Sequence, residues 1–188
     1  MSKRFGRPKQ LLRVKGNYLI VQVLGASMDS CLDHVVLVLG YRSKDILHAL
    51  GESVNTPRLQ VVINHRFREG QSRSLCLGLA QVKAAYPSVM FLLGDQPMVN
   101  SATIDYLLER FWNSEKDMCV PVCGGKRGNP TIFSRDFYET IMNIKGDVGA
   151  RTLIETNPER VLYAPIDNRN LFLDIDTEAD LQTWESLL

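Results

Sequence analysis

Three short apolar runs constrain the fold more than any other feature of this 188-residue chain. They are residues 33–40 (DHVVLVLG), 59–64 (LQVVIN) and 88–95 (SVMFLLGD). Each run is too short for a buried helix and is apolar at adjacent positions. That pattern is typical of parallel strands that are covered on both faces.

Longer amphipathic segments alternate with these runs and predict helices over 17–30, 72–85 and 103–112. Strand–helix–strand alternation predicts a three-layer α/β/α fold around a mostly parallel, doubly wound, Rossmann-like sheet. The length fits one domain, residues 1–188. Further strands are predicted over 117–122, 131–133, 160–164 and 171–174, and further helices after Ser134, over 148–156 and from Thr177.

Composition excludes several classes of protein. Hydrophobic residues make up 45% and charged residues 23%, which excludes a disordered, collagen-like or disulfide-rich chain. The net charge is +1, so neither nucleic acid nor an anionic membrane is an expected partner. No apolar run approaches the ~20 residues of a membrane span. Of the four cysteines, Cys119 and Cys123 have no histidine beside them, which favours core thiols in a reducing cytoplasm.

Acidic side chains follow two of the apolar runs. Asp95 comes directly after residues 88–93, at a carboxyl end of the predicted sheet, where open α/β folds bind ligands. Mg²⁺ prefers one or two carboxylates plus substrate phosphates, so Asp95 is a candidate metal ligand. The alternative is a turn residue that bonds only backbone. Asp174 is a second candidate, because Asp176 or Thr177 would cap the last helix.

Two further segments could hold phosphates or a polar ligand. Arg4, Arg7 and Lys9 surround Gly6 in a basic loop that suits a polyphosphate, or that is simply a solvated terminus. Residues 69–75 begin a helix whose free N–H groups could hold an anion, and Ser72 could equally be a plain N-cap. The three histidines lack a suggestive partner nearby, so no histidine-based nucleophile is expected.

Taken in order, these segments resemble the MobA-like nucleotidyltransferases, and in particular the molybdenum cofactor cytidylyltransferase branch. The family opens with a strand and then Ala-Ala-Gly-x-Ser-x-Arg-x-Gly-x-Pro-Lys, whose second half matches the start of this chain. The segments that carry the resemblance are residues 2–12 (SKRFGRPKQLL), 69–75 (EGQSRSL), 94–97 (GDQP), 128–130 (GNP), 146–151 (GDVGAR) and 174–177 (DIDT).

The resemblance implies transfer of CMP from CTP to a phosphorylated acceptor of the molybdopterin type, with Mg²⁺ as cofactor and pyrophosphate as product. A molybdoenzyme or its maturation chaperone is an implied protein partner. The attacking phosphate is already anionic, so no general base is required. Catalysis would rest on positioning and charge neutralisation by Arg4, Lys9 and Asp95. Metal would bind at Asp95 and Asp174.

The resemblance also implies two binding regions. The nucleotide would contact Arg4, Gly6, Lys9, Gln71, Ser72, Ser74, Gly94 and Asp95. The acceptor would contact Gly128, Asn129, Pro130, Asp147 and Arg151.

The sequence departs from the family pattern at its start, because Met1 aligns inside the family loop. The expected first strand, which should lie between the runs near Val36 and Leu92, and the Ala-Ala-Gly segment have no counterpart here. A translation start assigned too late, a shortened chain or a natural deletion would each produce this. We therefore expect a gap in the sheet and weak CTP binding. A non-catalytic maturation partner of a molybdoenzyme is one alternative. A transferase that uses GTP or a sugar or isoprenoid phosphate is another.

Overall fold

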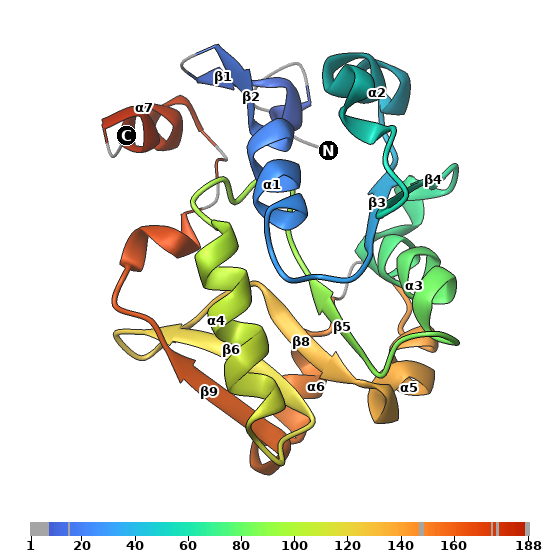
Figure 1. Cartoon of the computed structure of the whole chain (residues 1–188), viewed down its shortest axis with the longest axis vertical. Coiled ribbons are helices and arrows are strands. Elements are labelled where there is room, and N and C mark those ends of the chain that lie inside the picture. Colours follow the sequence, from blue (N-terminus) through green and yellow to red (C-terminus); the bar gives the residue numbers. More distant parts are fainter. Residues whose placement is uncertain (1–7, 15, 147–148, 174, 176, 187–188) are drawn as a thin grey trace.

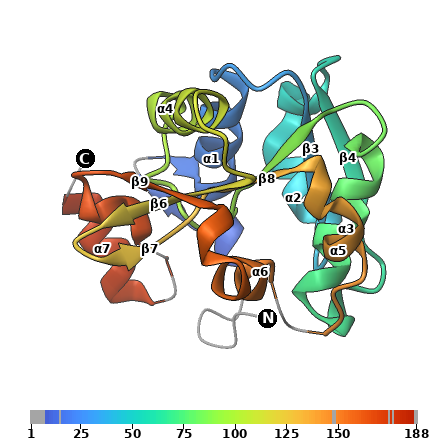
Figure 2. The same cartoon turned by 90° about the horizontal axis from the view of Figure 1, so that it is seen from below.

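The computed structural model describes residues 8–186 except 15, 147–148, 174 and 176. It has the predicted α/β architecture, with helices on both faces of the strands (Figures 1 and 2). One face carries α1 (Leu19–Met28), α2 (Ser43–Leu50) and α4 (Ser101–Trp112), and the other carries α3 (Gln71–Val82), α5 (Tyr138–Met142) and α6 (Arg151–Thr156). None of the described helices is both long and apolar enough to cross a membrane.

The strands form two main sheets in the described part of the chain. In the first, β3 (Val35–Leu39) pairs in parallel with β4 (Leu59–Ile63). In the second, β8 runs antiparallel between β5 and β6, and β9 runs parallel to β6. The bounds in this second sheet are β5 Ser88–Phe91, β8 Thr131–Ser134, β6 Met118–Cys123 and β9 Val161–Pro165, with β7 (Lys126–Arg127) in a hairpin on β6.

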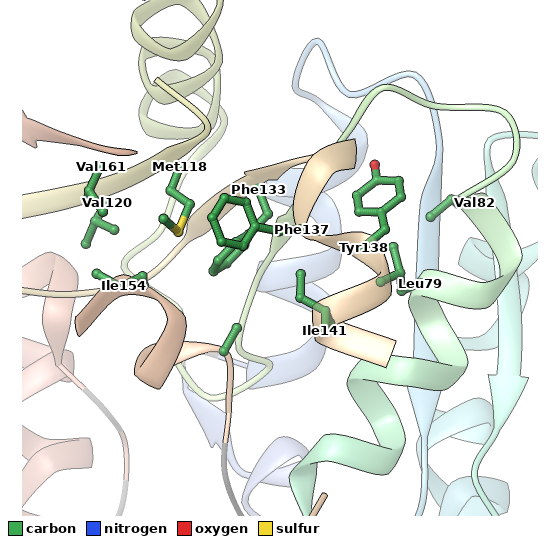
Figure 3. Packing of buried hydrophobic residues seen from close by; sticks show 11 residues of the cluster. Leu79, Val82, Met118, Val120, Phe133, Phe137, Tyr138, Ile141, Ile154 and Val161 are labelled. Carbon is green, nitrogen blue, oxygen red and sulfur yellow. The ribbon is translucent and has the colours of Figure 1, made fainter. Parts of the chain in front are cut away.

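Alternation along the central strands builds the two sides of the core. Met118 and Phe133 face α3, α5 and α6 (Figure 3). The Phe133 ring contacts the rings of Phe91 and Phe137 there. Cys119 and Ile132, the neighbours of these residues in sequence, face α4. Because successive side chains of a strand point to opposite faces, the apolar runs fill both layers. In β6 and β8 the strand residues are therefore covered on both faces. The three runs predicted to be fully covered became β3, β4 and β5, and most of their residues are only half-buried.

Two local features differ from the sequence predictions. Residues 171–174 were expected to form a strand, but residues Arg169–Phe172 form a 3₁₀ turn, η6. The Asn168 side chain accepts from the N–H of Asn170 at the start of this turn, and Leu171 packs into the α4 side of the core. The helix predicted after Ser134 begins as the 3₁₀ turn η4 (Arg135–Phe137) with Ser134 as its N-cap residue, but the Ser134 hydroxyl donates to Asp117 Oδ1 at 3.3 Å and makes no capping hydrogen bond.

Several short elements were missed in the sequence. Helix α2 buries only Ile46 and Leu50, four residues apart, so its apolar face is too small to stand out. The N-terminal hairpin of β1 (Arg13–Val14) and β2 (Asn17–Tyr18) has two-residue strands. The last helix, α7 (Glu178–Ser186), begins at the predicted place and packs Trp184 against Leu12 and Leu19.

A gap separates the two sheets between β3 and β5. Among the described residues, β3 pairs only with β4 and β5 only with β8. A cavity of about 530 Å³, here called the inter-strand cavity, lies between them, and residues 35–39 and 88–93 line it. The side chains of residues 36–38 and 89–91 are only half-buried. The sheet thus has the gap that the sequence predicts, between the runs near Val36 and Leu92.

All four cysteines are free thiols. Cys119 is buried, and burial raises its pKa to about 12. Cys119 and Cys123 lie in the same strand, where residues four apart have Cα atoms ~13 Å from each other, too far for a disulfide. We expect the native protein to show the intact mass of four reduced thiols and to bind no stoichiometric zinc. A mass lower by two hydrogens, or a tightly bound zinc ion, would contradict this.

Candidate nucleotide-binding site

Asp95 lies in a tight turn that directly follows β5. The Gln96 N–H donates to the Leu93 carbonyl at 3.3 Å, which reverses the chain at the carboxyl end of the strand. Gly94 suits this turn because an added Cβ would lie 3.2 Å from the Ile20 side chain. The packing of α1 against the turn therefore favours glycine here and places the Asp95 carboxylate at the rim of the sheet.

The side chains of Lys9 and Asp95 form an ion pair. Lys9 comes from the 3₁₀ turn η1 (Lys9–Leu11), so the pair joins the start of the described chain to the end of β5. Each side chain is only 18% exposed, which weakens the screening of the pair by water. The structure thus brings together two of the three residues predicted to be catalytic.

The C-terminal segment lies against the same turn. The N–H of Ile175 donates to the Asp95 carbonyl at 3.2 Å. Ile175 is fully buried beside Leu12, Leu19 and Trp184, which fixes this segment against the N-terminal turn. The predicted second metal ligand, Asp174, lies outside the described residues, as do Arg4, Gly6 and Asp147.

The beginning of α3 holds the predicted base-binding residues. Gly70 is the N-cap, with φ of 108°, so Ser72 is not the cap that one interpretation of the sequence expected. Instead, the buried Ser72 hydroxyl donates to the Gly146 carbonyl at 2.7 Å, and the Ser72 N–H lies 3.3 Å from the same oxygen. The main role that the structure shows for Ser72 is to join the start of α3 to the segment at residue 146.

Asn64 is a residue of this region that the sequence analysis missed. It ends the apolar run of β4 and is almost fully buried. Its Nδ2 donates to Ser74 Oγ at 3.0 Å, and its Oδ1 accepts from the Arg66 N–H at 2.9 Å. Asn64 therefore positions Ser74. A polar residue directly after an apolar strand was the available signal, the same one that identified Asp95.

Four of the eight predicted nucleotide-binding residues line the inter-strand cavity. Lys9, Gly94, Gln71 and Ser74 all line it, at the end where β3 and β5 finish. The rest of the lining comes mainly from apolar side chains of the two strands and of α1 and α3. A polar mouth at the carboxyl ends of strands, with an ammonium and a carboxylate beside it, is an arrangement suited to binding a nucleotide with its phosphates.

The segments predicted to bind the acceptor are held by separate contacts. The Gly128 N–H donates to the Pro121 carbonyl at 3.0 Å, and the Asn129–Pro130 peptide bond is cis. Arg151, an exposed residue of α6, contacts Glu155 at 2.9 Å. Arg127 contacts the same carboxylate oxygen at 3.2 Å, so two guanidinium groups converge on one acidic side chain.

Gly128 has a packing role that the sequence did not reveal. A Cβ at this position would lie 2.1 Å from the Phe172 ring. We expect Gly128→Ala to lower the free energy of unfolding by about 1–3 kcal/mol, because the ring must move out of its place. Urea unfolding measures the effect.

The matched control for this prediction is the double variant Gly128→Ala/Phe172→Ala, judged against Phe172→Ala alone. With the ring removed, the added methyl group should cost less than about 0.5 kcal/mol. An equal cost of Gly128→Ala in both backgrounds would show that contact with Phe172 is not the reason for glycine here.

Comparison with known proteins assigns the family. A family model described as the MobA-like NTP transferase domain matches residues 1–161. The chain belongs to this family. Probable molybdenum cofactor guanylyltransferases of Thermococcus sibiricus and Pyrococcus horikoshii are 24% and 26% identical to this MobA-like protein. These matches span 100% and 96% of the chain and 94% and 92% of the relatives.

Solved structures agree with this assignment. Rv0371c from Mycobacterium tuberculosis is 25% identical, with a TM-score of 0.87 over 99% of this chain and 92% of that one. A complex of Rv0371c with manganese gives a TM-score of 0.83 at 25% identity, over 96% and 93% of the two chains. The nucleotidyltransferase class of this MobA-like protein thus follows from its family, and the solved structures share its α/β fold.

Proposed function

We propose that this protein transfers a nucleoside monophosphate to a phosphorylated acceptor of the molybdopterin type. The observation that carries the proposal is the Lys9–Asp95 ion pair at the polar mouth of the inter-strand cavity. The motifs of the sequence favour CTP as the donor, whereas the relatives, named probable molybdenum cofactor guanylyltransferases, support GTP. A choice between the two bases depends on a few contacts in the pocket.

The proposed reaction is an in-line displacement. A phosphate oxygen of the acceptor attacks the α-phosphorus, a P–O bond forms, and the bond from the α-phosphorus to the bridging oxygen breaks. The electron pair leaves with pyrophosphate. The attacking oxygen is already anionic near neutral pH, so the chain needs no base to remove a proton. Its residues would act by holding the two phosphates in line and offsetting their charge.

Lys9 and Asp95 would carry out the charge part of this work. The Lys9 ammonium would transfer its contact from the Asp95 carboxylate to the triphosphate. Asp95 fits a hard cation, because its carboxylate lies at the carboxyl end of a strand beside the proposed phosphate position. Mg²⁺ bound there, with Asp174 as the second proposed ligand, would neutralise charge on the phosphates. The manganese complex of Rv0371c supports a divalent cation.

The other predicted residues would position the two substrates. Gln71 and Ser74 line the cavity mouth and would contact the base, with Asn64 holding the Ser74 hydroxyl. The acceptor would lie toward the segment at 128–130 and the exposed Arg151. The hydrogen bond between Ser72 and Gly146 would keep these two regions adjacent.

A nucleotide panel tests the proposal. GTP, CTP, ATP and UTP are each added with Mg²⁺, and the shift in melting temperature is followed by an assay of pyrophosphate release with molybdopterin. We expect one of GTP and CTP to give the largest shift and to support turnover. Lys9→Gln should remove the shift, whereas Lys116→Gln, at an exposed lysine whose ammonium contacts the Glu159 carbonyl, should retain it. Stabilisation without pyrophosphate release would favour the non-catalytic alternative.

A further inference from the structure

Two guanidinium groups converge on one carboxylate beside the β6–β7 hairpin. Arg127 Nη2 lies 3.2 Å from Glu155 Oε1, and Arg151 Nε lies 2.9 Å from the same oxygen. Arg127 belongs to the hairpin, whereas Arg151 and Glu155 lie one turn apart in α6, on the face of the sheet opposite α4 (Figure 2). The cluster combines two positive charges with one negative charge, so one positive charge remains in excess.

The backbones that carry the two arginines are held in place by the sheet and the core. Arg127 pairs with Val122 across the hairpin, and the N–H of Gly128 donates to the Pro121 carbonyl at 3.0 Å. Helix α6 is anchored by Ile154, which is buried in the core. The two guanidinium groups therefore start from fixed positions. An anion that binds both of them has to order only side chains, which lowers the cost of binding.

Stability does not account for two arginines on this carboxylate. Arg151 is 80% exposed and Glu155 is 43% exposed, and exposed ion pairs contribute little to the free energy of unfolding. The cluster can therefore release Glu155 at small cost. A phosphate group suits the two guanidinium forks better than a carboxylate, because it offers three oxygens and a charge of about −1.5 to −2 near neutral pH.

The cluster lies at the edge of the sheet that carries Asp95. Strands β5 and β6 both run antiparallel to β8, so their carboxyl ends meet at one edge. Asp95 follows β5, and Arg127 lies in the hairpin that follows β6. Contacts also connect the two segments. The Phe172 ring packs against Gly128, and Ile175, three residues further along, donates its N–H to the Asp95 carbonyl.

We propose that Arg127 and Arg151 bind the phosphate group of the acceptor, and that Glu155 holds the two guanidinium groups as an internal anion until that phosphate displaces it. This inference rests on the proposed function and adds Arg127 and Glu155 to the residues that meet the acceptor. Glu155 competes with the substrate instead of binding it. The affinity for phosphate should therefore fall when Arg127 is neutralised and rise when Glu155 is neutralised.

Inorganic phosphate is the first probe of this site. It is titrated into the 188-residue chain at constant ionic strength, and the Nε–Hε resonance of Arg151 is followed by NMR. Arg127→Gln should weaken phosphate binding at least about 10-fold, because charge-assisted hydrogen bonds are lost. Glu155→Gln should strengthen it about 2- to 5-fold, since the amide oxygen still accepts from a guanidinium group but carries no competing charge.

The matched control is Arg135→Gln, at an exposed arginine that follows the carboxyl end of β8 and donates to the Tyr86 carbonyl at 3.2 Å. It should bind phosphate as the unsubstituted chain does. Equal affinities of Arg127→Gln and Arg135→Gln would remove the site. Weaker binding by Glu155→Gln would show that Glu155 assists the phosphate, which would overturn its role as an internal anion.

Molybdopterin then replaces phosphate in the same titration, with no nucleotide present. Its dissociation constant should rise about 10-fold in Arg127→Gln and stay unchanged in Arg135→Gln. An unchanged affinity of Arg127→Gln for molybdopterin would overturn the assignment of this site to the acceptor. Because the titration measures binding alone, a chain that binds molybdopterin through Arg127 but releases no pyrophosphate would count against nucleotidyl transfer and for this site.

Discussion

Replacing Asp95 by asparagine is expected to lower Mg²⁺-dependent nucleotidyl transfer at least about 100-fold. The substitution keeps the size of the side chain but removes the charge that would hold the cation and pair with Lys9. Loss of one group that offsets transition-state charge raises the activation free energy by about 3 kcal/mol or more. An increase of that size lowers the rate about 100-fold. Pyrophosphate release over a range of Mg²⁺ concentrations, with the nucleotide chosen by the panel, is the measurement.

The matched control is Asp29→Asn, at an exposed carboxylate beyond the end of α1. Its rate should equal that of the unsubstituted chain. Urea unfolding of Asp95→Asn should stay cooperative, because the substitution leaves the buried apolar clusters unchanged. Near-normal turnover by Asp95→Asn would exclude it as the metal ligand of the reaction.

Replacing Phe133 by alanine is expected to lower the free energy of unfolding by about 3–5 kcal/mol. Phe133 is fully buried in β8, between β5 and β6. Its ring contacts that of Phe137 (Figure 3) and that of Phe91. Truncation leaves a cavity where two aromatic contacts and both neighbouring strands meet. Because domains are stable by only about 5–15 kcal/mol, this is a large share of the total. Urea unfolding followed by circular dichroism measures it.

Tyr163→Ala provides the control for Phe133, because Tyr163 is also an aromatic strand residue but is 41% exposed. It should cost less than about 1 kcal/mol. Phe133→Leu, which restores most of the lost volume, should fall between the two. If Phe133→Ala and Tyr163→Ala were equally stable, the cluster around β8 would not be the main core of the protein.

Much of the fold follows from local pattern. The apolar runs that became β3, β4 and β5 stand out because residues buried on both faces must be apolar at successive positions. The place of Asp95 could be predicted for the same reason, since it is the first charged residue after such a run. In contrast, helix α2 and the turn at Arg169–Phe172 contain few buried residues, so their apolar residues show no regular spacing in the sequence.

The partners of the site residues could not be predicted in this way. Ser72 resembled an N-cap by its position, but its hydroxyl reaches Gly146, which a helix start does not specify. Gly128 resembled part of a loop motif, yet the Phe172 ring against it is a sufficient reason for glycine. Each contact joins segments that are far apart in the chain, so it depends on how the layers pack.

The sequence by itself thus determined the order of strands β3, β4 and β5 and helices α1, α3 and α4, and the position of the candidate carboxylate, because periodicity and burial act over a few neighbouring residues. The gap between β3 and β5 was also expected from the sequence, but only the tertiary structure decided that Lys9 pairs with Asp95 and that the Ser72 hydroxyl reaches Gly146. Both contacts join segments that are far apart in the chain, so they depend on how the helices and strands pack against one another.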